Sequence, residues 1–214
     1  MDTEVFENLK KAILEYDKDL AANSAREVVE QKIDTLKAVE VMTDTIKQVG
    51  DAYGKGELWL PDLVGAGDAM SSAMKILDEV IKKEGKKREH LGSVVIGTVY
   101  GDIHSIGKDM VSTLLTAEGF EVHDLGTNVS PDDFINAIKE YNADLIAMSA
   151  LLTVTAPEQR TTIEALKKAS LREKVKVMVG GAATTQDFAD SIGADGFAPT
   201  APGGVKLARQ LLNK

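Results

Sequence analysis

The chain has 214 residues, 43% of them hydrophobic, and a formal net charge of −9, which suits one large domain or two small domains with apolar cores. It contains no cysteine, which excludes disulfides, iron–sulfur clusters and thiolate zinc sites, and its negative charge argues against general binding to nucleic acid. No apolar run of about 18 residues predicts a membrane span, and the acidic N-terminus does not resemble a signal peptide, so we expect a cytoplasmic protein that binds no membrane.

Residues 1–88 are predicted to form a helical bundle. Apolar residues recur at helical spacing in four segments with short connections, at residues 4–16, 23–34, 35–53 and 60–83. The first segment places a set of side chains on one face, namely Val5, Leu9, Ala12, Ile13 and Tyr16. Ser24 followed by Glu27 is a capping-box pattern, which predicts that the second helix begins at Asn23 or Ser24. Pro61 suits the first turn of the fourth helix, and the polar stretch at residues 82–90 is the predicted linker.

Strand and helix patterns alternate over residues 89–214. Strands are predicted at residues 93–100, 120–126, 143–150, 175–181 and 194–198. Helices are predicted at residues 105–119, 130–141, 156–170 and 184–193 and from about residue 203. Ser130 and Pro131 match the cap and the first position of one of these helices. This alternation favours a doubly wound, five-stranded parallel sheet, as in flavodoxin-like or Rossmann-like α/β domains.

Three unusual stretches are predicted to meet at one edge of this sheet. The first strand ends in "GDIHSIG", the third in the hydroxyl-rich "SALLTVT" and the fourth in "GGAATT". Ligands of open α/β sheets bind outside the carboxyl ends of the strands, near the switch in strand order. If the order is 2-1-3-4-5, that switch lies between the first and third strands, so the sequence predicts a binding site there.

Each stretch taken alone also has a purely structural interpretation. Asp102 can serve as a helix cap and His104 as a surface side chain, and two adjacent glycines are common in tight turns. A dinucleotide site is disfavoured because "GDIHSIG" does not match G-x-G-x-x-G. A hydrolytic zinc site is disfavoured because His90 and His123 do not have a useful spacing relative to His104.

The combination of motifs resembles a known family. "DIHSIG" matches the D-x-H-x-x-G motif of cobalamin-binding domains, and "SAL" and "GG" follow at the separations found in that family. Residues 49–70, "VGDAYGKGELWLPDLVGAGDAM", resemble the helical cap that precedes the cobalamin domain of methionine synthase. Because nearly the whole chain is covered, it resembles most closely the stand-alone corrinoid proteins of methyltransferase systems that act on methylamines, methanol or betaines.

The resemblance implies that cobalamin binds base-off/His-on. His104 would replace the corrinoid's own base as the lower axial ligand of cobalt. Asp102 would accept a hydrogen bond from the other ring nitrogen, which fixes the tautomer of a metal-bound imidazole. Thr155 matches the hydroxyl that ends the family's relay, with threonine in place of serine.

The resemblance also implies which other residues surround the cofactor. The nucleotide tail would enter a slot beside Ser149 and Thr153, where Gly180, Gly181 and Ala182 would leave room because they are small. Further cofactor contacts are expected from the motif residues Ile103, Ser105, Ile106, Gly107 and Leu151.

The helical half is expected to cover the reactive face of the corrin. By their match to the family's cap, Tyr53 and Leu60 would shield the methyl group, with Trp59 nearby. An ordinary role in the bundle core is the alternative for these three side chains. Such a lid would exclude water from a reactive centre.

The implied function is that of a methyl carrier, a component of a methyltransferase system rather than a complete enzyme. Methylcobalamin would be the carrier state, loaded by a substrate-specific corrinoid methyltransferase and unloaded by a second methyltransferase, with a reductive activase as a third partner. Two alternatives share the motif: a cobalamin-dependent sensor or regulator, and the small subunit of an adenosylcobalamin mutase. The bound upper ligand distinguishes them, because methyl or water favours the carrier and adenosyl favours either alternative.

Overall fold

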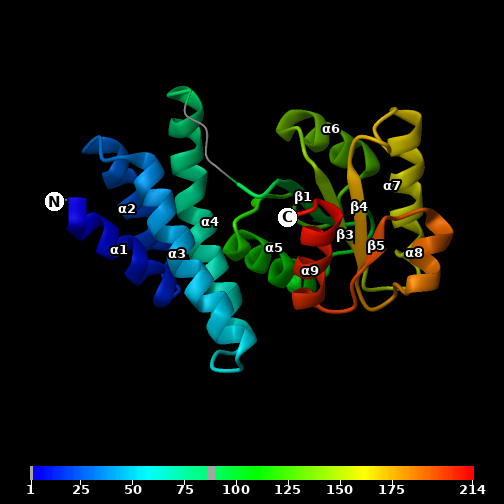
Figure 1. Ribbon diagram of the computed structural model, residues 1–214, viewed down its shortest axis with the longest axis horizontal. Helices are drawn as coiled ribbons and strands as arrows, with labels where there is room; N and C mark the ends of the chain where they lie inside the picture. The colour runs from blue at the N-terminus through cyan, green and yellow to red at the C-terminus, as the bar shows by residue number, and fades with distance from the viewer. Residues whose placement is uncertain (1, 86–89) are drawn as a thin grey trace. The chain divides into compact units, whose positions relative to one another are not determined.

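The chain divides into two compact units in the computed structural model, which describes residues 2–85 and 90–214 (Figure 1). One unit holds the N-terminal helices and the other holds the sheet. The predicted boundary between residues 88 and 89, with part of the predicted linker, lies outside the described residues. The described residues include no helix that is both long and apolar enough to cross a membrane.

The described residues 2–85 form four helices, as predicted. These are α1 (Asp2–Leu14), α2 (Lys18–Glu30), α3 (Thr35–Gly54) and α4 (Leu60–Lys83). Their apolar faces are buried together, and the largest fully buried side chains include Leu9, Ile13, Met42, Ile46, Leu63 and Leu77. Pro61 lies in the first turn of α4, where its missing N–H costs no hydrogen bond.

Two details of the helical prediction are wrong. The second helix begins at Lys18, because Asp17 accepts a hydrogen bond from the backbone N–H of Leu20 and caps it. Ser24 is therefore a small, buried residue in the middle of α2. Tyr16 lies beyond the end of α1 with a left-handed φ of 62°, and it packs against Gly65, where a Cβ would come within 2.9 Å of the Tyr16 Cβ.

The described residues 90–214 form a five-stranded parallel sheet in the order β2-β1-β3-β4-β5. Its strands are β1 (Ser93–Thr98), β2 (Glu121–Asp124), β3 (Leu145–Ser149), β4 (Lys176–Gly180) and β5 (Gly196–Phe197). The helices are α5 (Ile106–Glu118), α6 (Pro131–Tyr141), α7 (Pro157–Lys168), α8 (Gln186–Ile192) and α9 (Ala201–Leu211). The doubly wound α/β fold is thus confirmed.

Helices cover both faces of this sheet (Figure 1). On one face, side chains of α6, α7 and α8 form an apolar cluster that includes Phe134, Ile163 and Ile192. On the other face, α5 and α9 contribute Leu115 and Ala208 to a second cluster. Successive residues of a strand point to opposite faces, so β1 supplies both clusters from one continuous apolar run.

The register places the ends of three strands in one row. Thr98 of β1 pairs with Ser149 of β3, and Ser149 pairs with Gly180 of β4. The loops that follow these strands therefore emerge at the same edge of the sheet. Ser130 caps α6 as predicted, since its Oγ accepts from the backbone N–H of Asp133 at 3.2 Å. The last helix begins slightly earlier than expected, at Ala201, because Thr200 caps it.

Candidate functional site

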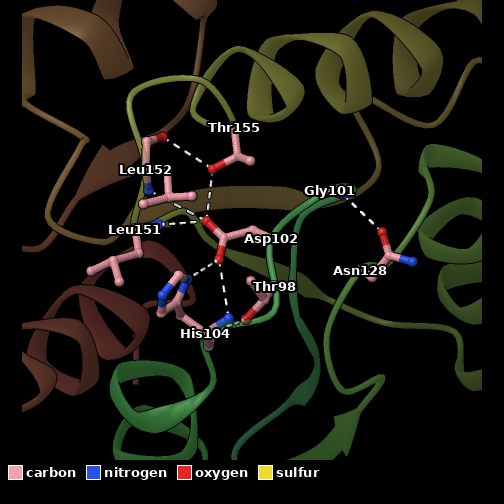
Figure 2. A network of polar contacts seen from close by, with 8 residues as sticks. All are labelled: Thr98, Gly101, Asp102, His104, Asn128, Leu151, Leu152 and Thr155. Atoms are coloured by element: carbon pink, nitrogen blue, oxygen red, sulfur yellow. Dashed lines mark hydrogen bonds and ion pairs between the residues drawn. The ribbon is translucent and has the colours of Figure 1, made fainter.

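The loop after β1 holds a buried carboxylate against a half-exposed imidazole. Nδ1 of His104 lies 2.7 Å from Oδ1 of Asp102 (Figure 2). The Asp102 side chain is fully buried, whereas 46% of the His104 side chain is exposed. The contact engages one ring nitrogen, so Nε2 is the atom of His104 that can bind a ligand.

Four further hydrogen bonds hold the Asp102 carboxylate. Oδ1 accepts from the backbone N–H of His104 at 3.0 Å, while Oδ2 accepts from the Thr155 hydroxyl at 2.7 Å and from the backbone N–H groups of Leu151 and Leu152 at 2.8 and 3.4 Å (Figure 2). Burial raises the pKa of Asp102, but the hydrogen bonds from Thr155, His104 and Leu151 together hold this pKa well below its ordinary value. The carboxylate is therefore ionised at neutral pH.

The ionised carboxylate determines the tautomer of His104. A carboxylate can only accept hydrogen bonds, so Nδ1 of His104 must carry the proton that joins it to Asp102. In the neutral imidazole, Nε2 then has the free lone pair, which is the form that binds a metal.

The strand ends fix the position of this pair. Thr98, the last residue of β1, is fully buried and donates its hydroxyl proton to the carbonyl oxygen of His104 at 2.8 Å. The backbone N–H of Asp102 donates to the carbonyl of Val99 at 3.1 Å, which closes a turn in which Gly101 has a φ of 77°. Thr98 was not predicted as a site residue. The available signal was a hydroxyl at the end of an otherwise apolar strand.

Exposed apolar side chains belong to the same loops. Ile103 and Ile106 flank His104 in the sequence and are 77% and 64% exposed, and Leu151 is 40% exposed. Large exposed apolar side chains in one place indicate a surface that a ligand or partner covers. Three more were not predicted and follow the same strands: Tyr100, Leu152 and Val154.

Gly107 leaves open space next to these residues. It lies in the first turn of α5, three residues after His104, and a Cβ added to it would meet nothing within 4 Å. Its backbone does not adopt a positive φ, so neither conformation nor packing within the chain requires glycine there. A single imidazole donor beside an open, apolar surface would suit a flat macrocycle such as the corrin ring, which carries metal-binding nitrogens of its own.

The residues predicted for the tail slot lie at the ends of β3 and β4. Ser149 and Gly180 are neighbours in the sheet and are half-buried, while Thr153, Gly181 and Ala182 are exposed. The structure explains the glycine at position 181 differently from the prediction, which was that it leaves room for the tail. Its φ is 105°, and a Cβ there would lie 2.0 Å from the carbonyl oxygen of Ala150. Gly181 is thus required by the chain's own backbone, whatever binds beside it.

The predicted shielding residues lie in the helical unit. Tyr53, near the end of α3, and Leu60, the first residue of α4, are both half-buried. Trp59 is 78% exposed, which contradicts the alternative that it belongs to the bundle core. Its backbone N–H donates to the Asp62 carboxylate at 2.7 Å, so its main chain is fixed at the start of α4.

Known protein families match both units of the chain. A family model described as a B12 binding domain matches residues 92–205, and a second model with the same description matches residues 5–78. The chain is 41% identical over 212 residues to a corrinoid protein of Desulfitobacterium hafniense (strain Y51), covering 98% of each chain. It is 41% identical over 211 residues to the trimethylamine corrinoid protein of Methanosarcina barkeri, covering 98% of this chain and 97% of that protein.

This chain is also similar to a solved structure over most of the length of both. The methanol:cobalamin methyltransferase complex MtaBC from Methanosarcina barkeri includes a chain that matches with a TM-score of 0.78 and 25% identity, covering 98% of this chain and 80% of that chain. The two family models, the relatives that align over nearly the whole chain, and the similar fold all agree. The chain belongs to the B12-binding family of corrinoid proteins.

Proposed function

We propose that this protein is a methyl carrier that binds cobalamin and works between two methyltransferases. One observation carries the proposal. The Thr155–Asp102–His104 chain of hydrogen bonds ends in a half-exposed imidazole nitrogen, within a chain that aligns over 98% of its length with a trimethylamine corrinoid protein. When bound, cobalamin supplies a cobalt atom that accepts a methyl group in one reaction and releases it in the next.

His104 would hold the cobalt of cobalamin through Nε2. Asp102 would keep the proton on Nδ1 and so maintain the lone pair on the metal-binding nitrogen. Thr155 would help to keep Asp102 ionised, because its hydroxyl donates to the carboxylate oxygen that does not face His104. These three residues would tune how strongly the imidazole donates, without acting on the methyl group themselves.

The surrounding residues would bind and orient the cofactor. Ile103, Ile106 and Leu151 would pack against the corrin, and Gly107 would let the ring approach the start of α5, with Ser105 beside it. Burial of these exposed side chains would contribute about 25 cal/mol for each Å² of apolar surface removed from water. The slot for the nucleotide tail would be lined by Ser149, Thr153, Gly180, Gly181 and Ala182.

The helical unit would protect the reactive face. Tyr53 and Leu60 would exclude water from the methyl group, and the exposed ring of Trp59 would extend this apolar cover. Such a cover limits side reactions, and it has to open so that each methyltransferase can reach the reactive face.

Three protein partners follow from this role. A substrate-specific methyltransferase would deliver the methyl group, a second methyltransferase would remove it, and a reductive activase would rescue oxidised protein. The similar structure is that of a methanol:cobalamin methyltransferase complex, and a similar relative is named for trimethylamine, so the donor would be a small methylated amine or alcohol. The protein would work in the cytoplasm.

Reconstitution followed by a transfer assay tests this function. The cobalamin-free protein should take up about one hydroxocobalamin per chain, and after reduction it should accept a methyl group from a donor methyltransferase with its methylamine or methanol. Failure to take up cobalamin by a folded protein would refute the binding site. Stable retention of adenosylcobalamin without methyl transfer would instead favour a regulator or a mutase subunit.

A further inference from the structure

Asn128 contacts the loop that carries His104, although it belongs to a loop that follows a different strand. It lies between β2 and α6, is exposed and has a left-handed φ of 56°. Its side-chain Oδ1 accepts a hydrogen bond from the backbone N–H of Gly101 at 2.8 Å (Figure 2). Its own backbone N–H donates to the carbonyl oxygen of Asp102 at 2.9 Å. Asn128 therefore holds two consecutive residues of the loop: its side chain holds Gly101, and its main chain holds Asp102.

The loop around Asn128 is itself fixed to β1. The backbone N–H of Thr98 donates to the carbonyl of Gly126, and the backbone N–H of Val129 donates to the carbonyl of Thr98, both at 3.0 Å. The hydroxyl of the same Thr98 holds the carbonyl of His104. Thr98 is therefore hydrogen-bonded both to the loop that carries Asn128 and to the backbone of His104.

The same loop region also holds the chain after His104. Lys108, on α5, is only 2% exposed and forms ion pairs with Asp124, the last residue of β2, and with Asp109. Asp124 in turn accepts from the backbone N–H of Gly126 at 2.8 Å. Residues 124–128 therefore contact the chain on both sides of His104, at residues 101–102 before it and at Lys108 of α5 after it.

We propose that Asn128 is a positioning residue for the His104–Asp102 pair. By fixing the backbone at Gly101 and Asp102, it sets the direction in which the buried carboxylate leaves the chain, and hence the orientation of the imidazole that the carboxylate holds. Asn128 would act only through these residues and would not touch cobalamin. The inference rests on the proposed role of His104 as the cobalt ligand.

Three variants separate this role from a general structural one. Asn128→Gly removes the Oδ1 acceptor and keeps the left-handed backbone, which glycine adopts without strain. Asn128→Asp keeps an acceptor oxygen, and aspartate also tolerates the left-handed region. The matched control is Asn142→Gly, because Asn142 is an exposed asparagine with a φ of 47° at the end of α6, where its backbone N–H donates to the carbonyl of Ile138.

The first measurement needs no cofactor. In cobalamin-free protein labelled with ¹⁵N-histidine, nitrogen chemical shifts report which ring nitrogen of His104 carries the proton. We expect the Nδ1–H tautomer to dominate in the wild type, in Asn128→Asp and in Asn142→Gly. In Asn128→Gly, the Nε2–H tautomer should increase several-fold, while the thermal unfolding midpoint stays within a few degrees of the wild type.

The second measurement uses the Co(II) form of the reconstituted protein. Asn128→Gly should show a smaller fraction of molecules with axial nitrogen splitting in electron paramagnetic resonance, and Asn128→Asp should restore that fraction. The positioning role is overturned if Asn128→Gly shows the wild-type tautomer and splitting, or if Asn142→Gly changes as much as Asn128→Gly does. It is also overturned if Asn128→Gly loses its fold. If the wild type shows no nitrogen splitting, the proposed role of His104 as the cobalt ligand fails, whereas the tautomer comparison still decides the role of Asn128.

Discussion

The Thr155 hydroxyl donates to the Asp102 carboxylate at 2.7 Å across a separation of 53 residues in sequence. This contact joins the loops that follow β1 and β3, two strands that are neighbours in the sheet but not in the sequence. It lies at the switch in strand order, where ligands of this kind of sheet bind. The bond helps to satisfy the buried carboxylate that also contacts the His104 imidazole.

Thr155→Val should therefore destabilise the folded protein, because it leaves one oxygen of a buried carboxylate short of a donor. Hydrogen bonds to charged groups contribute about 1.5–3 kcal/mol, so we expect a loss of that size in the free energy of unfolding, measured with urea. Thr155→Ser should lose much less. The control is Thr162→Val, which removes a buried hydroxyl that donates only to the Glu158 carbonyl. Equal losses at positions 155 and 162 would contradict the special role of the carboxylate.

Gly107→Ala should separate folding from cofactor binding. Alanine fits the open space at this helical position, and replacing glycine within a helix stabilises by about 0.5–1 kcal/mol. We expect the cobalamin-free protein to unfold at the same or a higher urea concentration, whereas its affinity for hydroxocobalamin, measured by titration, falls. Unchanged affinity would show that the corrin does not approach Gly107.

Gly181→Ala, unlike Gly107→Ala, should impair folding itself. The new Cβ would meet the Ala150 carbonyl oxygen at 2.0 Å in a backbone with a φ of 105°, so we expect severe destabilisation, seen as a lower unfolding midpoint before any cobalamin is added. A stable Gly181→Ala protein would mean that the backbone near Ala150 moves easily. The variant that better probes the tail slot is Gly180→Ala, whose Cβ would lie 3.1 Å from the Ala198 carbonyl oxygen.

Replacing Tyr53 and Leu60 together by alanine tests the proposed cover of the reactive face. Cobalamin binding should remain close to that of the wild type, because neither residue belongs to the loops around His104. Oxidation of the Co(I) form, followed by its absorbance at limiting oxygen, should become faster. Leu14→Ala is the control, since Leu14 is an exposed apolar residue of the same unit. An unchanged oxidation rate in the double variant would assign Tyr53 and Leu60 to packing alone.

The elements that could be predicted from sequence are those with strong local signals. Apolar periodicity and turn residues give the four helices and the alternation of strands and helices, and the Ser130–Pro131 pair gives the start of α6. The start of α2 was missed because Asp17 and Ser24 are both good cap residues. Only tertiary packing decides that Ser24 is small enough to lie buried within the helix.

The candidate site was predictable where its residues are close in sequence and match a motif, as with Asp102, His104 and Gly107. The supporting contacts of Thr98, Lys108 and Asn128 were not predicted. They depend on the register of β1 with β2 and β3, and no local pattern encodes that register. For the same reason, the collision that requires Gly181 became visible only once β3 and β4 were placed side by side.

The most direct test of the central claim is electron paramagnetic resonance of the Co(II) form prepared with ¹⁵N-histidine. The wild type should show axial splitting from one protein nitrogen, and His104→Ala should lose it while still binding cobalamin through the corrin and the tail. His90→Ala is the control, because His90 lies against Glu121 and outside the site, and it should keep the splitting. Splitting that persists in His104→Ala, or that never appears in the wild type, would contradict the assignment of His104 as the cobalt ligand.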